Sequence, residues 1–306
     1  MLPVRNGLGP SVVGLPAGQW DNLLAFLVHR FPAIPAAEWT ARMTRGDVVD
    51  EAGRAVVPDA HYRPHTRLYY YRDVPDEAPI AAKETVLFED EYLVVADKPH
   101  FLPVVPSGRY VHETLLARLR RKLSLDALTP LHRLDRETAG VVLFAKKPQT
   151  VHLYAEMFAQ RRMHKTYEAI APWRDGLDFP LEHQSRLVTG THFMQMHELP
   201  ATSADGTAAP VPNSHTRIEV LEVRATLARY RLTPHTGKRH QLRVHMAALG
   251  LPIVGDQIYP VLMPARAETP DTALRLLAQA IAFVDPISGA DRQFTSCQTL
   301  DFPVPT

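Results

Sequence analysis

The chain has 306 residues, of which 45% are hydrophobic and 22% charged, so we expect a packed core in one or two domains rather than disorder. Its 34 basic and 33 acidic residues nearly balance, so a nucleic-acid partner would have to bind a local basic surface. The single cysteine, Cys297, excludes an internal disulfide framework and a multi-cysteine metal site.

The N-terminal quarter is expected to hold a tail and a small module. Residues 1–10 lack the apolar core of a signal peptide, and no apolar run is long enough to span a bilayer, so we expect a cytoplasmic protein with no membrane partner. We expect residues 1–18 to form a loose tail and residues 19–75 a small α/β module. Its helices are expected at residues 20–31 and 36–45, and its strands at residues 48–49, 55–57 and 68–71. Residues 73–79, with two prolines and three acidic residues, are the predicted linker.

A larger domain over residues 80–306 is expected to mix strands and helices. Short apolar runs predict strands at residues 85–88, 92–96, 141–145, 167–171, 218–223 and 227–232. Apolar residues at helical spacing predict helices at residues 115–123, 151–158 and 238–249. Residues 184–213 are polar and contain glycine and prolines, so we expect an extended loop region there.

The first candidate site is Asp135, in the run His132-Arg133-Leu134-Asp135 that precedes the apolar strand at residues 141–145. Arg133 and Arg136 flank the aspartate, and nearby cations favour the ionised carboxylate that a nucleophile or base requires. A loop aspartate in a surface ion pair would look the same, so these residues alone leave both interpretations open.

Two further segments carry candidate binding or catalytic residues. Tyr167, in the run Lys165-Thr166-Tyr167-Glu168, lies at a predicted helix-to-strand junction, where it would stack on a base or relay a proton. A core tyrosine in a strand is the simpler interpretation. On the predicted helix at 238–249, Arg239 and Arg243 lie four residues apart and share a face suited to phosphates or a carboxylate. A solvated basic helix face would explain the same pattern.

Taken together, these runs resemble the RluA branch of the pseudouridine synthases, which modify ribosomal and transfer RNA. The resemblance covers roughly residues 85–260, and its motifs occur in the expected order. They are Leu87-Phe88-Glu89-Asp90, Val94-Val95-Ala96-Asp97-Lys98-Pro99, His132-Arg133-Leu134-Asp135, Leu143-Phe144-Ala145-Lys146, Lys165-Thr166-Tyr167, Thr236-Gly237, His240-Gln241-Leu242-Arg243-Val244-His245 and Gly255-Asp256 with Tyr259.

The resemblance implies that Asp135 is the catalytic aspartate, Tyr167 the active-site tyrosine and Arg243 the arginine that pairs with the aspartate. It also implies that Arg133 helps to displace the target nucleotide. We expect the remaining substrate-binding residues to be His132, Lys165, Lys238, Arg239, His240 and Gln241, and further phosphate contacts from Arg118, Arg121, Lys122 and Arg161.

Three residues depart from the family's pattern. Ala139 stands where the family usually has serine, Lys238 where it usually has arginine, and Arg239 where threonine or lysine is common. Each departure roughly keeps size or charge, so it bears on RNA contacts more than on the chemistry.

The resemblance further implies an α+β fold with a central, mainly antiparallel mixed sheet, flanking helices and an RNA-binding cleft. The small N-terminal α/β module resembles, more weakly, an alpha-L RNA-binding domain, from Trp39-Thr40-Ala41-Arg42 to Tyr62-Arg63-Pro64. The implied reaction breaks the N1–C1′ bond of a uridine, turns the base and rejoins it through C5, so we expect neither a metal nor a cofactor. The expected partner is ribosomal or transfer RNA, and the expected oligomeric state is a monomer.

Two other functions compete with this interpretation. A non-catalytic RNA-binding or assembly protein on the same fold is disfavoured because Asp135, Tyr167 and Arg243 are all present. A hydrolase that uses Asp135 would need a second carboxylate on the other side of the substrate. The obvious candidate, Glu137, lies two residues away in the same loop and would be hard to place there, so a hydrolase is disfavoured.

Overall fold

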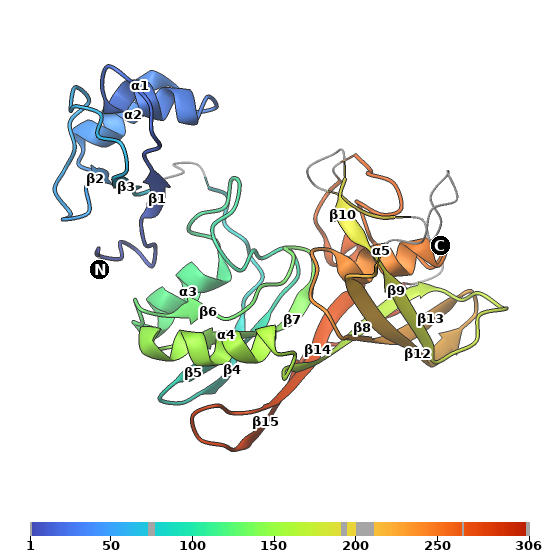
Figure 1. The fold of residues 1–306 in the computed structure, drawn as a ribbon. Coiled ribbons are helices and arrows are strands. Elements are labelled where there is room, and N and C mark those ends of the chain that lie inside the picture. Colours follow the sequence, from blue (N-terminus) through green and yellow to red (C-terminus); the bar gives the residue numbers. More distant parts are fainter. Residues whose placement is uncertain (1, 73–76, 191–194, 200–210, 265, 304–306) are drawn as a thin grey trace. The chain divides into compact units, whose positions relative to one another are not determined.

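The computed structural model describes residues 2–72, 77–190, 195–199, 211–264 and 266–303 (Figure 1). The chain folds into two compact units, the first made of residues 1–79 and 105–126 and the second of residues 80–104 and 127–306. Residues 105–126 thus group with the small unit, whereas we expected them in the larger domain. Part of the predicted linker, residues 73–76, lies outside the described residues. None of the described helices has the length and apolar character needed to span a membrane.

The first unit combines a small antiparallel sheet with helices. Its strands, in spatial order, are β1 (Ser11–Gly14), β3 (Arg67–Tyr70) and β2 (Val48–Val49), and its described helices are α1 (Leu23–Arg30), α2 (Ala36–Thr44) and α3 (Leu115–Leu123). The apolar faces of α1 and α2 meet around Phe26, Leu27 and Trp39, which are fully buried. Helix α1 begins where the Asn22 side chain accepts a hydrogen bond from the backbone N–H of Ala25 (2.8 Å).

The expected tail is partly ordered structure. Residues 11–14 form β1, in which Val13 lies opposite Leu68 of β3, and Val13 and Leu15 are both buried. The strand is too short for its alternation to indicate a strand from the sequence. The hairpin expected at residues 48–57 is reduced to one bridge between Val49 and Ala55, while β2 pairs with β3. That residues 19–75 form an alpha-L-like RNA-binding module stays a prediction.

The second unit is built on one large, mainly antiparallel sheet, which confirms the expected α+β class. Among the described residues it has ten strands, and its main path runs β4-β5-β7-β14-β8-β13-β12-β9, with β6 beside β7 and β15 beside β14. Of the strand pairs within the described ranges, only β14 and β7 run parallel. The strands are β4 (Thr85–Glu89), β5 (Leu93–Lys98), β6 (Thr129–Pro130), β7 (Ala139–Ala145), β8 (His164–Pro172), β9 (Leu181–Ser185), β12 (Ser214–Arg224), β13 (Leu227–Pro234), β14 (Leu276–Val284) and β15 (Asp291–Thr295).

Two helices cover different halves of this sheet (Figure 1). Helix α4 (Val151–Ala159), which follows the short 3-10 turn Pro148–Thr150, buries Tyr154 and Met157 against β5, β7 and β14. Helix α5 (Gln241–Ala248) buries Leu242 and Met246 against β8, β12 and β13. A second 3-10 turn, Pro270–Thr272, precedes β14. Each half of the sheet therefore has its own helix and its own apolar cluster.

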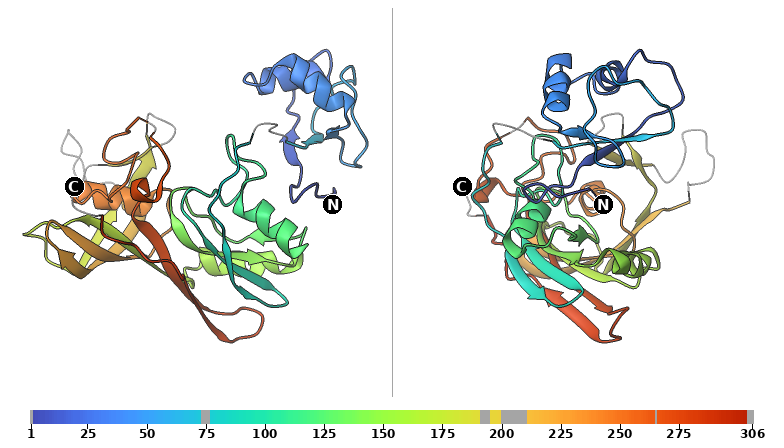
Figure 2. Two further views of the ribbon diagram at one scale, coloured as in Figure 1. Left: turned by 180° about the vertical axis from the view of Figure 1, so that it is seen from behind. Right: turned by 90° about the vertical axis from the view of Figure 1, so that its left-hand side faces the viewer.

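Strand β14 joins the two halves of the sheet, as the view from behind shows (Figure 2). We made no prediction for this strand, which is apolar except for Gln279 and lacks the alternation of a half-exposed strand. At the parallel junction Gly140 lies opposite Ala278 with a φ of +116°. A Cβ at residue 140 would lie 2.2 Å from the carbonyl oxygen of Ala278, so only glycine fits this close approach.

Two other expectations need correction. Residues 184–213, expected as loop, include the end of β9 and the paired strands β10 (Leu187–Thr189) and β11 (Met196–Glu198), while residues 191–194 and 200–210 lie outside the described residues. Helix α5 begins at Gln241 rather than Lys238, because His240 takes the left-handed backbone conformation (φ +55°) and so lies outside the helix.

Candidate active site

Asp135 lies in the loop that leads into β7. The buried side chains of Leu134 and Thr138 anchor this loop on either side of it, and the backbone N–H of Thr138 donates a hydrogen bond to the Asp135 carbonyl (3.1 Å). The Asp135 side chain keeps 26% of its surface exposed and lines a cavity of about 540 Å³. The carboxylate is therefore fixed by its loop and still accessible to a ligand.

Arg243 of α5 contacts the same carboxylate. Its Nη1 donates to Oδ2 of Asp135 (3.2 Å), while Nε and Nη2 donate to the two oxygens of Asp256 (2.8 and 2.7 Å). The side chains of Arg243 and Asp256 are almost fully buried, with exposed fractions of 2% and 1%. Burial lowers the pKa of Arg243, but hydrogen bonding to Asp256 and the nearby carboxylates outweigh it and leave the pKa above its ordinary value. The guanidinium is thus a fixed, permanently charged support for Asp135.

Asp256 is itself held by the backbone that follows it. Its Oδ1 accepts hydrogen bonds from the backbone N–H groups of Ile258 (2.8 Å) and Tyr259 (3.0 Å), in addition to the bond from Arg243. A carboxylate with this many donors is locked in one orientation. Asp256 therefore fixes the position of Arg243, and Arg243 in turn fixes the position of Asp135 in the cavity.

His240 approaches Asp135 from another side. Its Nε2 lies 3.7 Å from Oδ1 of Asp135, and its Nδ1 lies 2.9 Å from the hydroxyl of Tyr259, which accepts a hydrogen bond from the backbone N–H of Met196 (2.8 Å). Burial lowers the pKa of His240 although the Asp135 carboxylate raises it, so the ring is neutral at pH 7. When Tyr259 donates to Nδ1, the proton of the ring sits on Nε2 and faces Asp135.

Tyr167 of β8 lines the same cavity as Asp135. Burial raises the pKa of the Tyr167 hydroxyl well above its ordinary value, and the Asp135 carboxylate raises it further. The phenol therefore stays protonated at neutral pH, and it offers the cavity a ring face and a hydroxyl rather than a phenolate.

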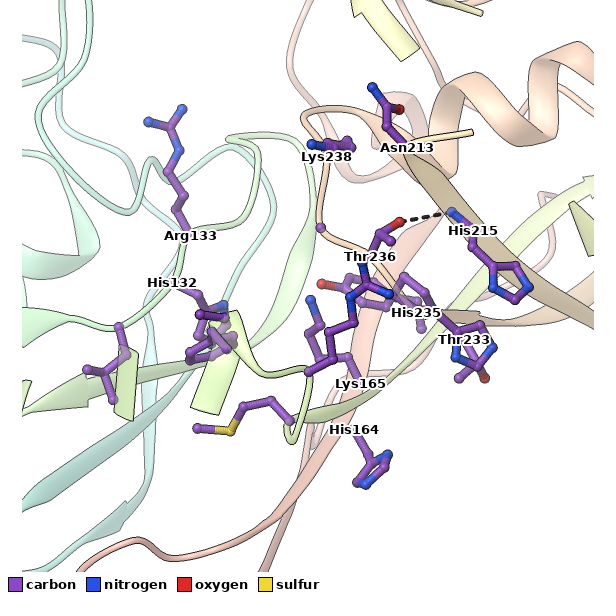
Figure 3. Close-up of a pocket in the computed structure, with 18 residues that line it drawn as sticks. His132, Arg133, His164, Lys165, Asn213, His215, Thr233, His235, Thr236 and Lys238 are labelled. Atoms are coloured by element: carbon purple, nitrogen blue, oxygen red, sulfur yellow. Dashed lines mark hydrogen bonds between the residues drawn. The ribbon is translucent and has the colours of Figure 1, made fainter. Parts of the chain in front are cut away.

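A second cavity of about 840 Å³ adjoins the first and shares Arg133, Lys165, Tyr167, Pro234, Thr236, Gly237 and Lys238 with it. Its walls come from the loop before β7 and from β8, β12 and the end of β13 (Figure 3). Arg133, Arg161, Lys165 and Lys238 are among its lining residues. Cationic side chains and a ring face along one continuous hollow suit a polyanion with bases.

The comparisons with known proteins agree with this geometry. Residues 92–248 match the family model described as RNA pseudouridylate synthase. The tRNA pseudouridine synthase C of Pasteurella multocida is 33% identical over 227 residues, which is 71% of this chain and 91% of that protein. The chain belongs to the RluA family of RNA pseudouridine synthases.

Other members of the pseudouridine synthases are similarly close. The dual-specificity RNA pseudouridine synthase RluA of Haemophilus influenzae is 29% identical over 220 residues, 71% of this chain and 94% of that one. The solved structure of human RNA pseudouridylate synthase domain containing 4 covers 71% of this chain and 88% of its own, with 26% identity and a TM-score of 0.55. Like them, this pseudouridine synthase is an isomerase that acts on uridine in RNA.

The structure sorts the expected substrate-binding residues of this synthase into two groups. Arg133, Lys165, Lys238, Arg239 and His240 line the cavities. Arg239 does so from the turn before α5, so the shared helix face with Arg243 that we expected does not exist. Arg118 pairs with Glu113, and Arg118, Arg121 and Lys122 lie in the first unit rather than in the unit that holds Asp135.

His132 and Gln241 also line the cavities, but their polar atoms already have protein partners. Nε2 of His132 accepts the backbone N–H of Leu143 (3.1 Å), and burial lowers the pKa of His132 to about 3, with Lys165 lowering it further. The Gln241 amide nitrogen donates to the carbonyl of His215 (3.0 Å) and the hydroxyl of Thr216 (2.9 Å). Both side chains thus hold the walls of the site together.

Asp256 and Lys98 are the residues whose roles the sequence analysis missed. Both lie in motifs of the family resemblance, but the partner that gives each its role lies on another element, Arg243 for Asp256 and the carbonyl of Arg136 for Lys98. The Nζ of Lys98 donates to the carbonyls of Pro99, Leu102 and Arg136 (2.9, 2.7 and 3.0 Å), which ties β5 to the residue after Asp135. Burial lowers the pKa of Lys98 to about 7, although Glu137 and Asp135 raise it. Neither contact has a local sequence signal.

Proposed function

We propose that this pseudouridine synthase isomerises a specific uridine in transfer or ribosomal RNA, with Asp135 as its catalytic carboxylate. The contact between Asp135 and the buried Arg243 (3.2 Å) carries the proposal, because Asp256 fixes that guanidinium from behind. The adjoining cavity of about 540 Å³ has the size of a typical small-ligand site, which suits a single nucleoside. The name of the tRNA pseudouridine synthase C relative supports transfer RNA as a substrate class, and the name of the dual-specificity relative supports action on more than one RNA substrate.

In this proposal the target uridine leaves its stack to enter the cavity, because a base inside a helix is out of reach. Arg133 is exposed on the loop of Asp135 and lines both cavities, which suits a side chain that displaces the target nucleotide. Lys165, Lys238, Arg239 and Arg161 supply contacts to the flanking phosphates.

The chemistry assigned to Asp135 follows one of two routes. Asp135 either attacks C1′, forming a C1′–O bond as the N1–C1′ bond breaks, or removes the C2′ proton as the same bond breaks. The freed uracil turns and C5 bonds to C1′, as the C1′–O bond to Asp135 breaks in the first route or as C2′ regains its proton in the second. C5 then loses its proton and N1 gains one, so the product is an isomer of the substrate. Both routes need an ionised carboxylate in a fixed orientation, and the Arg243 contact supports that requirement.

Tyr167 is assigned to the base. A protonated phenol beside Asp135 supports stacking on the uracil and hydrogen bonding during its rotation. Its help in removing the C5 proton stays a prediction. His240 is assigned to orient Asp135, and His132 and Gln241 to hold the cavity walls.

We further propose that the protein acts as a cytoplasmic monomer. All residues that line the two cavities belong to the second unit of one chain, which supports a site that needs no second copy. Light scattering of the purified protein with and without RNA tests this, and a dimer that forms only with RNA would contradict it.

Mapping of pseudouridines in total RNA from a strain that lacks this protein tests the function. We expect one or a few pseudouridines in transfer or ribosomal RNA to disappear and to return with the wild-type gene, but not with Asp135→Asn. An unchanged pseudouridine map, or full complementation by Asp135→Asn, would contradict the proposal.

A further inference from the structure

A cluster of two histidines and a glutamate lies on the wall of the larger cavity, outside the set of residues assigned to the isomerisation. Glu182 belongs to β9, His215 to β12, and His235 directly follows β13. Their ligand atoms, one per side chain, all lie within 4.8 Å of one another. His215 and His235 line the cavity of about 840 Å³, and Figure 3 shows both on its β12–β13 wall.

The sheet itself brings the three side chains together. Strands β13, β12 and β9 are neighbours, and the backbone N–H of His235 donates to the carbonyl of His215 (3.0 Å), so these residues are cross-strand partners. Glu182 lies opposite Arg217, two residues from His215 on the same face of β12. Three adjacent strands therefore present one carboxylate and two imidazoles at a single point on one face.

We propose that Glu182, His215 and His235 bind a divalent transition metal ion, with Zn²⁺ as the best match. Two imidazoles and one carboxylate are the ligand set of open zinc sites, in which a fourth position is left to water or another ligand. Because both histidines line the cavity, that fourth position is accessible from it. The site is separate from the isomerisation, for which we expect no metal.

The distances suit a metal after small side-chain movements. Nε2 of His215 lies 2.6 Å and Nε2 of His235 lies 4.0 Å from Oε2 of Glu182. Ligand atoms about 2 Å from a tetrahedral zinc stand roughly 3.3 Å apart, which falls between these two values. The His235 ring is exposed and makes no hydrogen bond within the described residues, so it can turn toward the site at little cost. Glu182 would exchange its hydrogen bond with His215 for the metal and keep its bond from Arg217.

Arg217 is suited to orient the carboxylate. Its Nη1 donates to Oε1 of Glu182 (3.3 Å), which leaves Oε2 toward the histidines. Carboxylate ligands of metals are commonly held by such a partner on the second oxygen.

The buried cluster of His183, Glu198 and His245 is a weaker candidate, although it contains the same ligand types. Nε2 of His245 already has the hydroxyls of Ser185 (3.1 Å) and Ser214 (2.9 Å) as partners, and its Nδ1 has the hydroxyl of Thr216 (2.9 Å). A metal there would have to displace hydrogen bonds in a buried, satisfied network.

The test is titration of the chelator-treated full-length protein with Co²⁺, followed by its visible absorption, and with Zn²⁺ by calorimetry. We expect one equivalent bound with a dissociation constant below the micromolar range. His215→Ala and His235→Ala should each weaken it by more than about 100-fold, and Arg217→Ala by about 10–100-fold, the range for residues that orient a ligand. His164→Ala, in the same cavity, and His183→Ala, in the buried cluster, should bind like the wild type.

Three outcomes would overturn the assignment. The first is that the wild-type protein binds no tight equivalent of Co²⁺ or Zn²⁺. The second is that His215→Ala and His235→Ala both bind the metal ion as tightly as the wild type. The third is that His183→Ala loses metal binding, which would place the metal in the buried cluster. Thermal unfolding in chelator should match the wild type for His215→Ala and His235→Ala, because His215 is half-buried and His235 is exposed. The wild-type titration decides the question even for a variant that fails this check.

Discussion

Replacing Asp256 with asparagine removes the charge that holds Arg243 while nearly preserving shape. Taking one partner from a buried ion pair costs about 3–5 kcal/mol of unfolding free energy, because the other charge stays buried. Asp135 at 3.2 Å and Glu137 at 3.9 Å still compensate Arg243 in part, so we expect about 3 kcal/mol, the lower end. This is a large share of the stability of an ordinary domain and is readily measured by urea unfolding.

The same substitution should slow the reaction. A guanidinium that loses its two bonds to Asp256 no longer fixes Asp135, and a misplacement of about 1 Å costs roughly 100-fold in rate. We therefore expect kcat to fall by about 100-fold with a much smaller change in KM, measured by tritium release from RNA that contains 5-tritiated uridine.

Two further variants separate stability from chemistry. Glu91→Gln breaks an exposed ion pair with Lys147 and should leave the unfolding free energy nearly unchanged. The double variant Arg243→Met/Asp256→Asn removes both buried charges but keeps an acceptor for the backbone N–H groups of Ile258 and Tyr259. It should regain much of the stability that Asp256→Asn loses, yet be inactive. Wild-type stability and kcat in Asp256→Asn would refute the view that Asp256 holds the catalytic pair.

Three other substitutions test separate parts of the account. Gly140→Ala should lower the unfolding free energy by about 1–3 kcal/mol, because the new Cβ meets the Ala278 carbonyl; no loss in thermal or urea unfolding would contradict this. Tyr167→Phe should keep RNA affinity within a few fold but slow pseudouridine formation, and an unchanged single-turnover rate would leave the hydroxyl without a role. The pKa of His132 falls from 6.5 to about 3 on folding, so only the unfolded chain gains this proton as the pH drops from 6.5 toward 3. Stability should therefore fall in this window by up to about 1.4 kcal/mol per pH unit, and less steeply in His132→Asn; equal slopes would contradict the burial of a neutral ring.

Much of the fold was predictable because it follows local patterns. Helices α1, α2, α3 and α4 and the strand pair β4–β5 appear where apolar periodicity indicated them. Strand β14 escaped prediction because its burial on both sides removes the alternation that marks a strand. The start of α5 was wrong because one left-handed residue, His240, ends the helical pattern, and no sequence rule indicates that conformation there.

The candidate site was predictable to the extent that its residues matched family motifs. Asp135, Tyr167 and Arg243 lie around one cavity, as the resemblance implied. Asp256 and Lys98 owe their roles to partners on other elements, Arg243 and the carbonyl of Arg136, and such pairings depend on tertiary packing. The expected phosphate contacts were least predictable, because charge alone does not distinguish Lys238 in the cavity from Arg118 paired with Glu113.

The catalytic assignment of Asp135 is tested most directly by single-turnover tritium release from 5-tritiated uridine RNA, with wild type and Asp135→Asn compared at saturating protein. Asparagine preserves the size of the side chain and an acceptor for Arg243, so the fold and RNA binding should persist. We predict no tritium release above background from Asp135→Asn while gel-shift affinity for the RNA stays within a few fold of the wild type. Release at the wild-type rate would contradict the central claim that this carboxylate carries the reaction.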